Sequence, residues 1–344
     1  MKRKLIILTV LTCIGSHSFS QNEKHFSMFS GTKVQINPAT SGFYKSKYLM
    51  QANYRNQWAS VTDFPFRTYS ASFNMRAYTD DFGKKTVAGG MFFYNDVVGD
   101  NRYVQTQIVV PVSYSIRLNE YNHLSFGLSP GFYQRNVRST NYTWSSQWTG
   151  TYFDEEINSR EGILGDRYSL SKFDVGAGLY WETELSEINY MGFGVSGTHL
   201  TKSKINFFEE DHRMYRGLNV HYFGNFGREG LNVTFMPDVM YFMQGTNKYL
   251  VFGSRFDVLV RGQSIHTGFY DRTSLEFGTH LRLNDALILS TKIHNGKFSA
   301  GFSYDIVVSS LNNFTGARGA SEFYISYRFG QGARAGTIEI APEE

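Results

Sequence analysis

The sequence has almost no cysteine, no long apolar run and no concentrated charge. Its single cysteine, Cys13, lies near the start, so no disulfide framework is expected in the rest of the chain. After the first 20 residues no stretch reaches the roughly 18 consecutive apolar residues that a transmembrane helix needs. The net charge of +4 is spread over 344 residues without a basic tract, so nucleic acid is not an expected partner.

The first 20 residues read as a leader. Basic residues at 2–4 precede an apolar run from Leu5 to about Gly15, and small residues follow up to Ser20. This pattern predicts a secretory signal peptide, residues 1–20, cleaved near Ser20. Cys13 is a poor lipoprotein cysteine because Val10-Leu11-Thr12 is a poor approach to one and the apolar run continues past it.

Alternation with a period of two is the dominant feature of the mature chain. In residues 297–308 it is almost without error, and it returns at 104–119, 173–182, 218–226 and 250–261. Only a strand with unlike faces needs such a period. Seventeen per cent aromatic residues and 33 glycines are typical of a membrane barrel, which uses aromatic girdles and curved strands. We therefore predict an all-β protein, a single transmembrane antiparallel β-barrel in the outer membrane.

Turn signals divide residues 47–330 into about 14 strands. Short turns alternate with long connections at 137–171, 202–213 and 309–320. Outer-membrane barrels keep short turns on the periplasmic side, so an even strand number places both termini in the periplasm. Residues 21–46 are then an N-terminal periplasmic segment, and 331–344 a flexible periplasmic tail. The predicted strands centre on 47–58, 67–77, 85–97, 103–118, 123–136, 172–183, 190–201, 214–226, 231–243, 249–262, 273–283, 286–294, 297–308 and 321–329.

Two motifs suggest catalysis or nucleotide binding but sit in the wrong context. Gly127-Leu128-Ser129-Pro130-Gly131 matches G-x-S-x-G, yet it lies inside an alternating strand where Pro130 prevents the helix that a nucleophile elbow requires. Residues 192–197 spell G-x-G-x-x-G without a helix behind them to hold a phosphate. We interpret both as small residues in curved strands and expect neither an enzyme nor a cofactor.

Metal binding has weak support. The acidic clusters at 154–156 and 209–211 would supply oxygen ligands for calcium if they met, but solvated loops explain them as well. The histidines lack the spacing of zinc ligands. We predict no metal site, and lumen or interface positions for His199, His212, His221, His266, His280 and His294.

Several short motifs follow one another in the order of a known family. The chain opens with Asn37-Pro38-Ala39-Thr40-Ser41-Gly42 and continues with Tyr54-Arg55-Asn56-Gln57-Trp58. Later matches are Gly197-Thr198-His199-Leu200, Arg282-Leu283-Asn284-Asp285-Ala286-Leu287, Gly301-Phe302-Ser303-Tyr304-Asp305-Ile306 and Glu322–Phe329. Together they resemble the PorP/SprF family of the Bacteroidetes type IX secretion and gliding machinery. Segments 137–171 and Gln263–Arg272 match the family less well.

The resemblance implies a barrel without catalytic activity. Family members support export or surface anchoring of adhesins that carry a C-terminal sorting domain, and they associate with periplasmic ring lipoproteins. Gliding motility is then an expected context. The alternative is a channel or transporter for a small or hydrophobic solute, its lumen lined by Arg117, Arg255, Asp257, Arg261 and Arg328; a lumen filled by the protein's own segments would argue against it.

Candidate partner-binding residues lie in the N-terminal segment and the long loops. Asn37 and Pro38 precede the barrel on the expected periplasmic side. Aromatic side chains flanked by charge favour recognition, so the loops supply the rest. Arg55 is expected to face the lumen and to need a carboxylate such as Asp257 or Asp305. The loop candidates are Tyr142, Trp144, Trp148, Phe207 and Phe208, with Tyr152, Phe153 and Phe314 as further aromatic anchors.

Overall fold

The structure is a computed structural model of the chain. The expected leader, the tail 331–344, and the segments 204–212 and 263–270 lie outside the described residues. The described residues are 26–44, 46–80, 83–99, 103–138, 144–154, 156–158, 167–186, 188–203, 213–228, 230–262 and 271–330.

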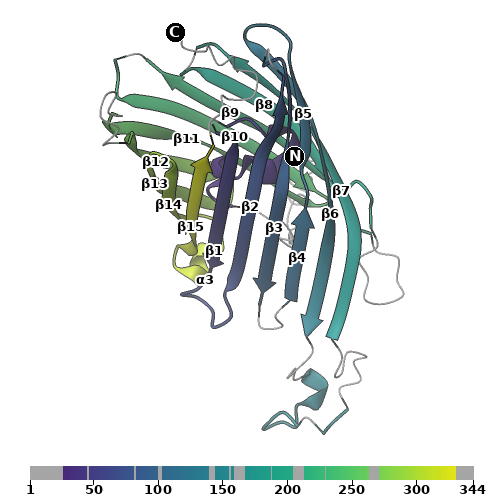
Figure 1. Cartoon of the computed structure of the whole chain (residues 1–344). Helices are drawn as coiled ribbons and strands as arrows, with labels where there is room; N and C mark the ends of the chain where they lie inside the picture. The colour runs from purple at the N-terminus through teal and green to yellow at the C-terminus, as the bar shows by residue number, and fades with distance from the viewer. Residues whose placement is uncertain are drawn as a thin grey trace, which may run out of the picture.

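One antiparallel sheet closes on itself to form a barrel, because β1 pairs with both β2 and β15 (Figure 1). β4 and β5 are two halves of one wall strand interrupted at Val110-Pro111, since both pair with β3 and β6. The fifteen strands therefore make a 14-strand barrel, which confirms the predicted fold class. The strands are β1 (Tyr48–Gln57), β2 (Phe66–Thr79), β3 (Lys85–Val98), β4 (Tyr103–Val109), β5 (Val112–Arg117), β6 (Asn122–Arg138), β7 (Arg167–Glu184), β8 (Tyr190–Thr198), β9 (Gly217–Gly227), β10 (Val233–Gln244), β11 (Asn247–Arg261), β12 (Thr273–Arg282), β13 (Ala286–Asn295), β14 (Phe298–Val307) and β15 (Arg318–Phe329).

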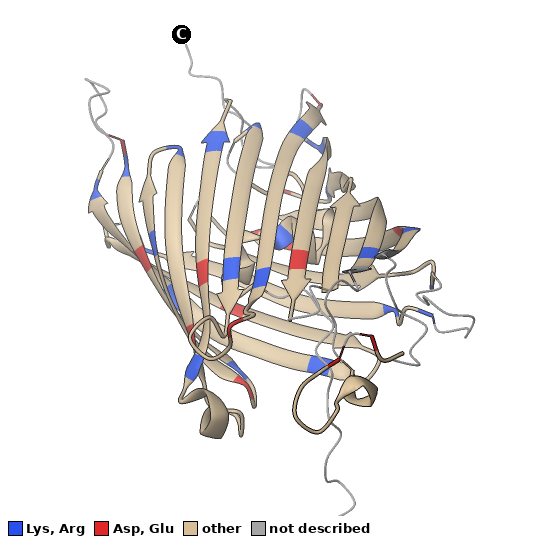
Figure 2. Ribbon diagram, turned by 90° about the horizontal axis from the view of Figure 1, so that it is seen from below, with Lys and Arg blue, Asp and Glu red and all other residues tan. Residues whose placement is uncertain are grey.

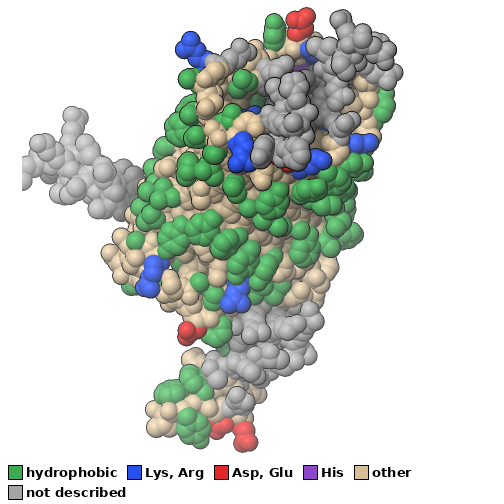
Figure 3. Space-filling model, turned by 60° about the vertical axis from the view of Figure 1, so that its left-hand side comes forward, with side chains coloured by type: hydrophobic (Ala, Val, Ile, Leu, Met, Phe, Trp, Pro, Cys, Tyr) green, Lys and Arg blue, Asp and Glu red, His purple; other side chains and the backbone are tan. Residues whose placement is uncertain are grey.

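The period of two separates an apolar outer face from a polar lumen. In β15, Phe323, Ile325 and Tyr327 are exposed, while Glu322 and Ser326 are buried. Apolar side chains form a broad band across the wall (Figure 3). Acidic and basic positions lie within the strands as well as at their ends (Figure 2). A closed ladder pairs every strand with two neighbours, which is what a lipid-embedded sheet requires.

The helices of the described residues are all short. They are η1 (Phe29–Gly31), α2 (Lys33–Ile36), η2 (Pro38–Thr40), η3 (Ser145–Gln147) and α3 (Asn312–Thr315). None in this part of the chain is long and apolar enough to cross a membrane.

The two ends of the barrel differ. Tyr48 pairs with Phe329, so β1 begins and β15 ends at the same rim, which we call the terminal end. The connections β6–β7, β8–β9 and β14–β15 all lie at the opposite rim, which we call the loop end. Most connections at the terminal end are short. The exception is the connection between β11 and β12, which contains the segment Gln263–Arg272 that matches the resembled family less well.

The outer face predicts a strong penalty for charge. Phe302 lies at the middle of β14, 38% exposed and packed on Phe323 of β15 with 5.0 Å between ring centroids. Phe302→Arg should lower the free energy of unfolding by about 2–4 kcal/mol, because arginine is costly at the bilayer midplane. Urea unfolding of the barrel refolded in lipid vesicles measures this.

Phe302→Leu is the control and should cost much less, since it keeps the face apolar. Equal costs for Arg and Leu would contradict a lipid-facing position. The neighbouring Ser303 points the other way and is fully buried in the lumen.

Candidate functional site: an occupied lumen and an aromatic loop end

The N-terminal segment fills the barrel. Residues 26–44, which we call the plug, fold into η1, α2 and η2, and most of their side chains are buried against the inner wall. The sequence predicted a segment outside the barrel on the periplasmic side. The described part instead lies in the lumen, with Asn37 and Pro38 covered by the wall.

Asn37 and Pro38 shape the turn at the centre of the plug. The Asn37 Oδ1 accepts a hydrogen bond of 2.9 Å from the backbone N of Ala39 and so caps η2. Pro38 occupies the first position of η2, where its fixed φ suits the turn and its missing N–H leaves no donor unpaired. The Asn37 Nδ2 donates to the carbonyl of Leu179 on β7 at 2.9 Å. The Asn-Pro pair therefore both folds the plug and fastens it to the wall.

Three glycines on neighbouring strands form the seat for this turn. A Cβ at Gly127 of β6 would lie 2.5 Å from the carbonyl carbon of Pro38. A Cβ at Gly178 of β7 would collide with the Asn37 Oδ1, and one at Gly194 of β8 would lie 2.7 Å from the Asn37 Nδ2. Only glycine leaves room for the plug at these three positions.

The seat explains one glycine of each of the two motifs. Gly127 belongs to the G-x-S-x-G match, and that match lies within β6. Gly194 belongs to the G-x-G-x-x-G match, which lies within β8. Both motifs lie in strands, as predicted, but Gly127 and Gly194 are required by the turn of the plug and not by wall curvature alone. The sequence signal for this role was that both glycines occupy lumen-facing positions of alternating strands.

Aromatic residues anchor the plug at three heights. Phe26 packs against Phe92 and Tyr94 of β3, and Phe43 meets Tyr180 of β7 edge to face at 4.9 Å. Phe29 lies in an apolar cluster on the opposite wall. Burial of a phenylalanine contributes about 1.5–3 kcal/mol, so these contacts oppose loss of the plug. The Phe29 cluster consists of Phe223, Met240, Val251 and Ile288.

Buried ions hold the first residues of the plug. Glu322 accepts from the backbone N of Ser27 at 2.6 Å, and the Ser27 hydroxyl donates to Asp305. The Arg55 Nη2 lies 2.9 Å from the Asp305 Oδ2, and the Arg282 Nη2 lies 2.8 Å from the same oxygen. Arg55 was expected to need a carboxylate such as Asp257 or Asp305, and Asp305 is the one that it contacts. The plug thus completes a charge network that spans four strands.

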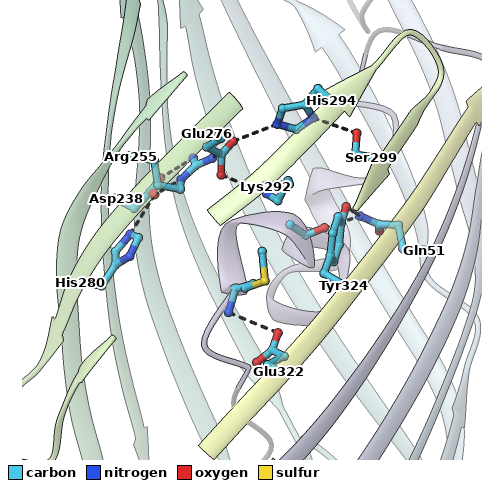
Figure 4. A network of polar contacts seen from close by, with 12 residues as sticks. Gln51, Asp238, Arg255, Glu276, His280, Lys292, His294, Ser299, Glu322 and Tyr324 are labelled. Atoms are coloured by element: carbon cyan, nitrogen blue, oxygen red, sulfur yellow. Dashed lines mark hydrogen bonds and ion pairs between the residues drawn. The ribbon is translucent and has the colours of Figure 1, made fainter. Parts of the chain in front are cut away.

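A second network lies on β10 to β13 (Figure 4). Arg255 lies 2.6 Å from Asp238 and 3.1 Å from Glu276. Glu276 also contacts Lys292 at 3.1 Å and His294 at 3.2 Å. Asp238 and Glu276 are buried, so each carboxylate needs these cations. Asp257, the other carboxylate considered for Arg55, lies 3.9 Å from Arg272 at the terminal end.

The described histidines take structural positions. His221 stacks on Tyr180 and packs at a tilt against Phe223. Three of the other histidines considered pair with single carboxylates, while His212 and His266 lie outside the described residues. Within the residues that the structure describes, no three metal-ligating side chains gather. The pairs are His199 with Asp174, His280 with Asp238, and His294 with Glu276.

Unfilled space remains beside the plug. A cavity of about 60 Å³ lies beside the plug between Phe29 and Tyr249. A wider one of about 880 Å³ lies near the terminal end, lined by Phe43, Tyr44 and Arg328 among others. At the glycine seat the turn of the plug is fully buried against the wall.

A comparison with protein families identifies the family of this barrel. The family model described as type IX secretion system membrane protein PorP/SprF matches residues 18–327, nearly the whole chain. The chain belongs to the PorP/SprF family. Its members are membrane proteins of type IX secretion, and an outer-membrane location follows from family and barrel together. Curated proteins give no match to this PorP/SprF chain.

Several solved barrels are similar in structure to this PorP/SprF protein. A Pseudomonas aeruginosa FadL homologue is 10% identical, with 85% of this chain and 93% of that chain covered and a TM-score of 0.49. The P. putida toluene transporter TodX is 9% identical, with 86% and 93% covered and a TM-score of 0.48. BamA from Haemophilus ducreyi lacking POTRA domains 1–3 is 8% identical, with 83% and 70% covered and a TM-score of 0.40.

The loop end of this PorP/SprF protein carries a folded aromatic projection between β6 and β7. Trp144 donates its backbone N–H to the Gln147 Oε1, and Gln147 Nε2 donates to the carbonyl of Ile157, which ties both sides of the projection together. Trp148 and Phe153 bridge their backbones and pack at 4.8 Å, yet remain 48% and 46% exposed. We call residues 144–158 the aromatic knob.

The other predicted loop residues divide into two groups. Tyr152 and Phe314 are exposed at 60% and 82%, so both are available to a partner. Tyr142, Phe207 and Phe208 lie outside the described residues, as does the acidic cluster 209–211.

Proposed function

We propose that this protein is a non-enzymatic accessory barrel of type IX secretion that binds a cognate exported adhesin at its loop end. The PorP/SprF match over residues 18–327 is the observation that carries the proposal. The loop end then faces the cell surface and the terminal end the periplasm, because such barrels keep their short turns in the periplasm.

The aromatic knob supports a binding role. Exposed Trp, Tyr and Phe side chains on a hydrogen-bonded scaffold lose little entropy when they meet a partner, and a few such residues dominate binding energies. Its sequence, 144–158, carries Asp154, Glu155 and Glu156 and no basic residue. The partner surface that fits this knob is therefore apolar with a positively charged border.

The terminal end supports contact with periplasmic ring lipoproteins of the machine. Asn37 and Pro38 remain candidates from the sequence, but in the plugged barrel they face the wall, so docking there requires the plug to leave. Lys47 is exposed at this rim and Arg328 lines the wide cavity there, so both are further candidates for the contact.

The occupied lumen favours this function over the solute channel. The plug contacts β6, β7 and β8 at the glycine seat and, through Phe29, the wall across the barrel, so it occupies space that an aqueous pathway would need. Arg255, one of the expected lumen-lining residues, is buried in an ion network, while Arg117 donates to turn carbonyls at the terminal end.

Loss of the knob should remove the adhesin. Replacing residues 144–158 by a short Gly-Ser linker is expected to abolish surface display of one or a few adhesins while bulk type IX secretion continues, because the knob lies outside the strand ladder. Surface proteomics of the variant and parent strains measures this. Normal display of every surface protein, together with reduced uptake of a solute, would favour the transporter instead.

Trp148→Ala is the point variant of the same test. It should weaken adhesin binding by about 2 kcal/mol, the usual loss for a central aromatic anchor. Val61→Ala, in the β1–β2 connection at the same end, is a matched control that should leave binding unchanged.

A further inference from the structure

The wide cavity at the terminal end, which we call the vestibule, has the size of a binding site. Its volume is about 880 Å³, and residues of β8 to β13 and of β15 form its wall. Phe43 and Tyr44, the last residues of the plug, also line it. Leu231 on the lining is 63% exposed, so the vestibule reaches the surface of the protein. Ligand sites commonly have volumes of about 300–1,000 Å³.

The described lining of the vestibule carries more unbalanced basic side chains than acidic ones. Glu276 belongs to the second buried network, where cations already surround it (Figure 4). Asp257 lies 3.9 Å from Arg272. Among the described lining residues this leaves the carboxylate of Asp271 against three further cations. These cations are Arg228, Lys297 and Arg328. The vestibule therefore favours an anionic ligand.

Two of the three cations are free to bind such a ligand. The side chains of Arg228 and Lys297 are exposed, and neither makes an ion pair or a hydrogen bond with any residue that the structure describes. The hydroxyl of Tyr44, on the plug side of the lining, is buried and also has no hydrogen-bond partner in this part of the chain. Buried polar atoms are costly to leave unpaired, so a polar ligand would stabilise this lining.

The two free cations are too far apart for one small anion. Arg228 lies in the β9–β10 connection and Lys297 in the β13–β14 connection, so four strand intervals separate them. At about 4.8 Å per interval, the separation is about 20 Å along the wall. An extended chain covers this span with about six residues of about 3.3 Å each. Leu259 of β11 lines the vestibule between the two cations.

We propose that the vestibule binds an extended acidic segment of a polypeptide partner. Its carboxylates pair with Arg228 at one end and with Lys297 and Arg328 at the other. Arg328 is suited to this because its backbone N donates to the Lys297 carbonyl at 2.8 Å, which keeps the two residues adjacent. Apolar side chains of the segment pack against Leu231 and Leu259. The partner is periplasmic if the terminal end faces the periplasm, an assignment that rests on the proposed function.

Fluorescence anisotropy with the purified full-length barrel in a neutral detergent tests the proposal. The probe is a rhodamine-labelled Glu-Glu-Leu-Leu-Glu-Glu peptide, and a Lys-Lys-Leu-Leu-Lys-Lys peptide is the charge control. The acidic peptide should bind and the basic peptide should not. Binding should weaken when the salt concentration rises from about 0.05 to 0.5 M, because salt screens exposed charges. Absence of saturable binding of the acidic peptide would overturn the proposal.

Single charge reversals test whether the ligand bridges the two cations. Arg228→Glu and Lys297→Glu should each weaken binding of the acidic peptide about tenfold, which corresponds to about 1.4 kcal/mol. Both side chains are exposed, so these variants leave the strand ladder intact. Lys85→Glu is the matched control, because Lys85 is exposed at the same end but lies on β3, away from the vestibule wall. A loss in only one of the two variants, or an equal loss in the control, would contradict bridging.

Citrate distinguishes a peptide site from a small-anion site. One citrate is too short to reach both cations, so a millimolar excess should leave most of the peptide bound. Complete displacement by citrate would make the vestibule a small-anion site and would overturn the peptide assignment. The purified protein is measured without an adhesin, so peptide binding and the surface display tested with the aromatic knob succeed or fail independently.

Discussion

Gly127→Leu is expected to convert a closed barrel into a conducting one. At this position even a Cβ would lie 2.5 Å from the Pro38 carbonyl carbon and closer still to the backbone N of Ala39. Backbone atoms of a capped turn cannot yield as a flexible side chain can, so the turn must leave its seat. Overpacking of this kind costs about 1–3 kcal/mol for one methyl-sized intrusion, and a leucine intrudes further.

Planar-bilayer recordings measure the outcome. The parent protein should show no steady conductance, and Gly127→Leu should show open-channel events that persist through the recording. Gly262→Leu is the control, because Gly262 has no atom within 4 Å of its would-be Cβ. A Gly127→Leu barrel as silent as the control would mean that the plug does not close the lumen.

The barrel itself was predictable from the sequence. Strands such as 298–307 show alternating apolar and polar residues, because one face of each strand points toward lipid and the other toward the lumen. Successive residues point to opposite faces, so the sequence shows this contrast directly. The loop lengths then fixed which connections share an end. The break at Val110-Pro111 left one expected strand in two halves, since Pro111 cannot donate to the ladder.

The plug was not predictable in the same way. Residues 26–44 have no period, because their contacts are with wall strands far away in the sequence. The Ser27 backbone N donates to Glu322, and the Asn37 side chain contacts Leu179 and Gly178. Such contacts leave no local pattern. Asp305 could be predicted as a candidate partner of Arg55 only because a buried arginine that faces the lumen needs a carboxylate. That requirement limits the candidate partners to the few acidic residues at inward-facing positions.

Arg55→Ala is expected to destabilise the barrel by about 3–5 kcal/mol, because it leaves buried carboxylates without a partner. Arg55 lies 2.9 Å from Asp305 and 3.7 Å from Glu322, and all three side chains are almost fully buried. Asp305 keeps its ion pair with Arg282. The variant therefore acts mainly on Glu322, which loses its cation, and on Ser27 of the plug, which contacts both Arg55 and Glu322. Urea unfolding in lipid vesicles measures the cost, with the exposed Lys248→Ala as a control that should stay within about 0.5 kcal/mol.

A double variant separates an uncompensated charge from lost packing. Arg55→Met with Glu322→Gln removes both charges of the weaker pair, while the glutamine oxygen can still accept from the backbone N of Ser27. The double variant should therefore be more stable than Arg55→Met alone, although it carries one more change. If its cost instead equals the sum of the two single costs, Arg55 and Glu322 are not coupled. The Arg55 guanidinium would then act on the plug through Ser27 and Asp305 alone.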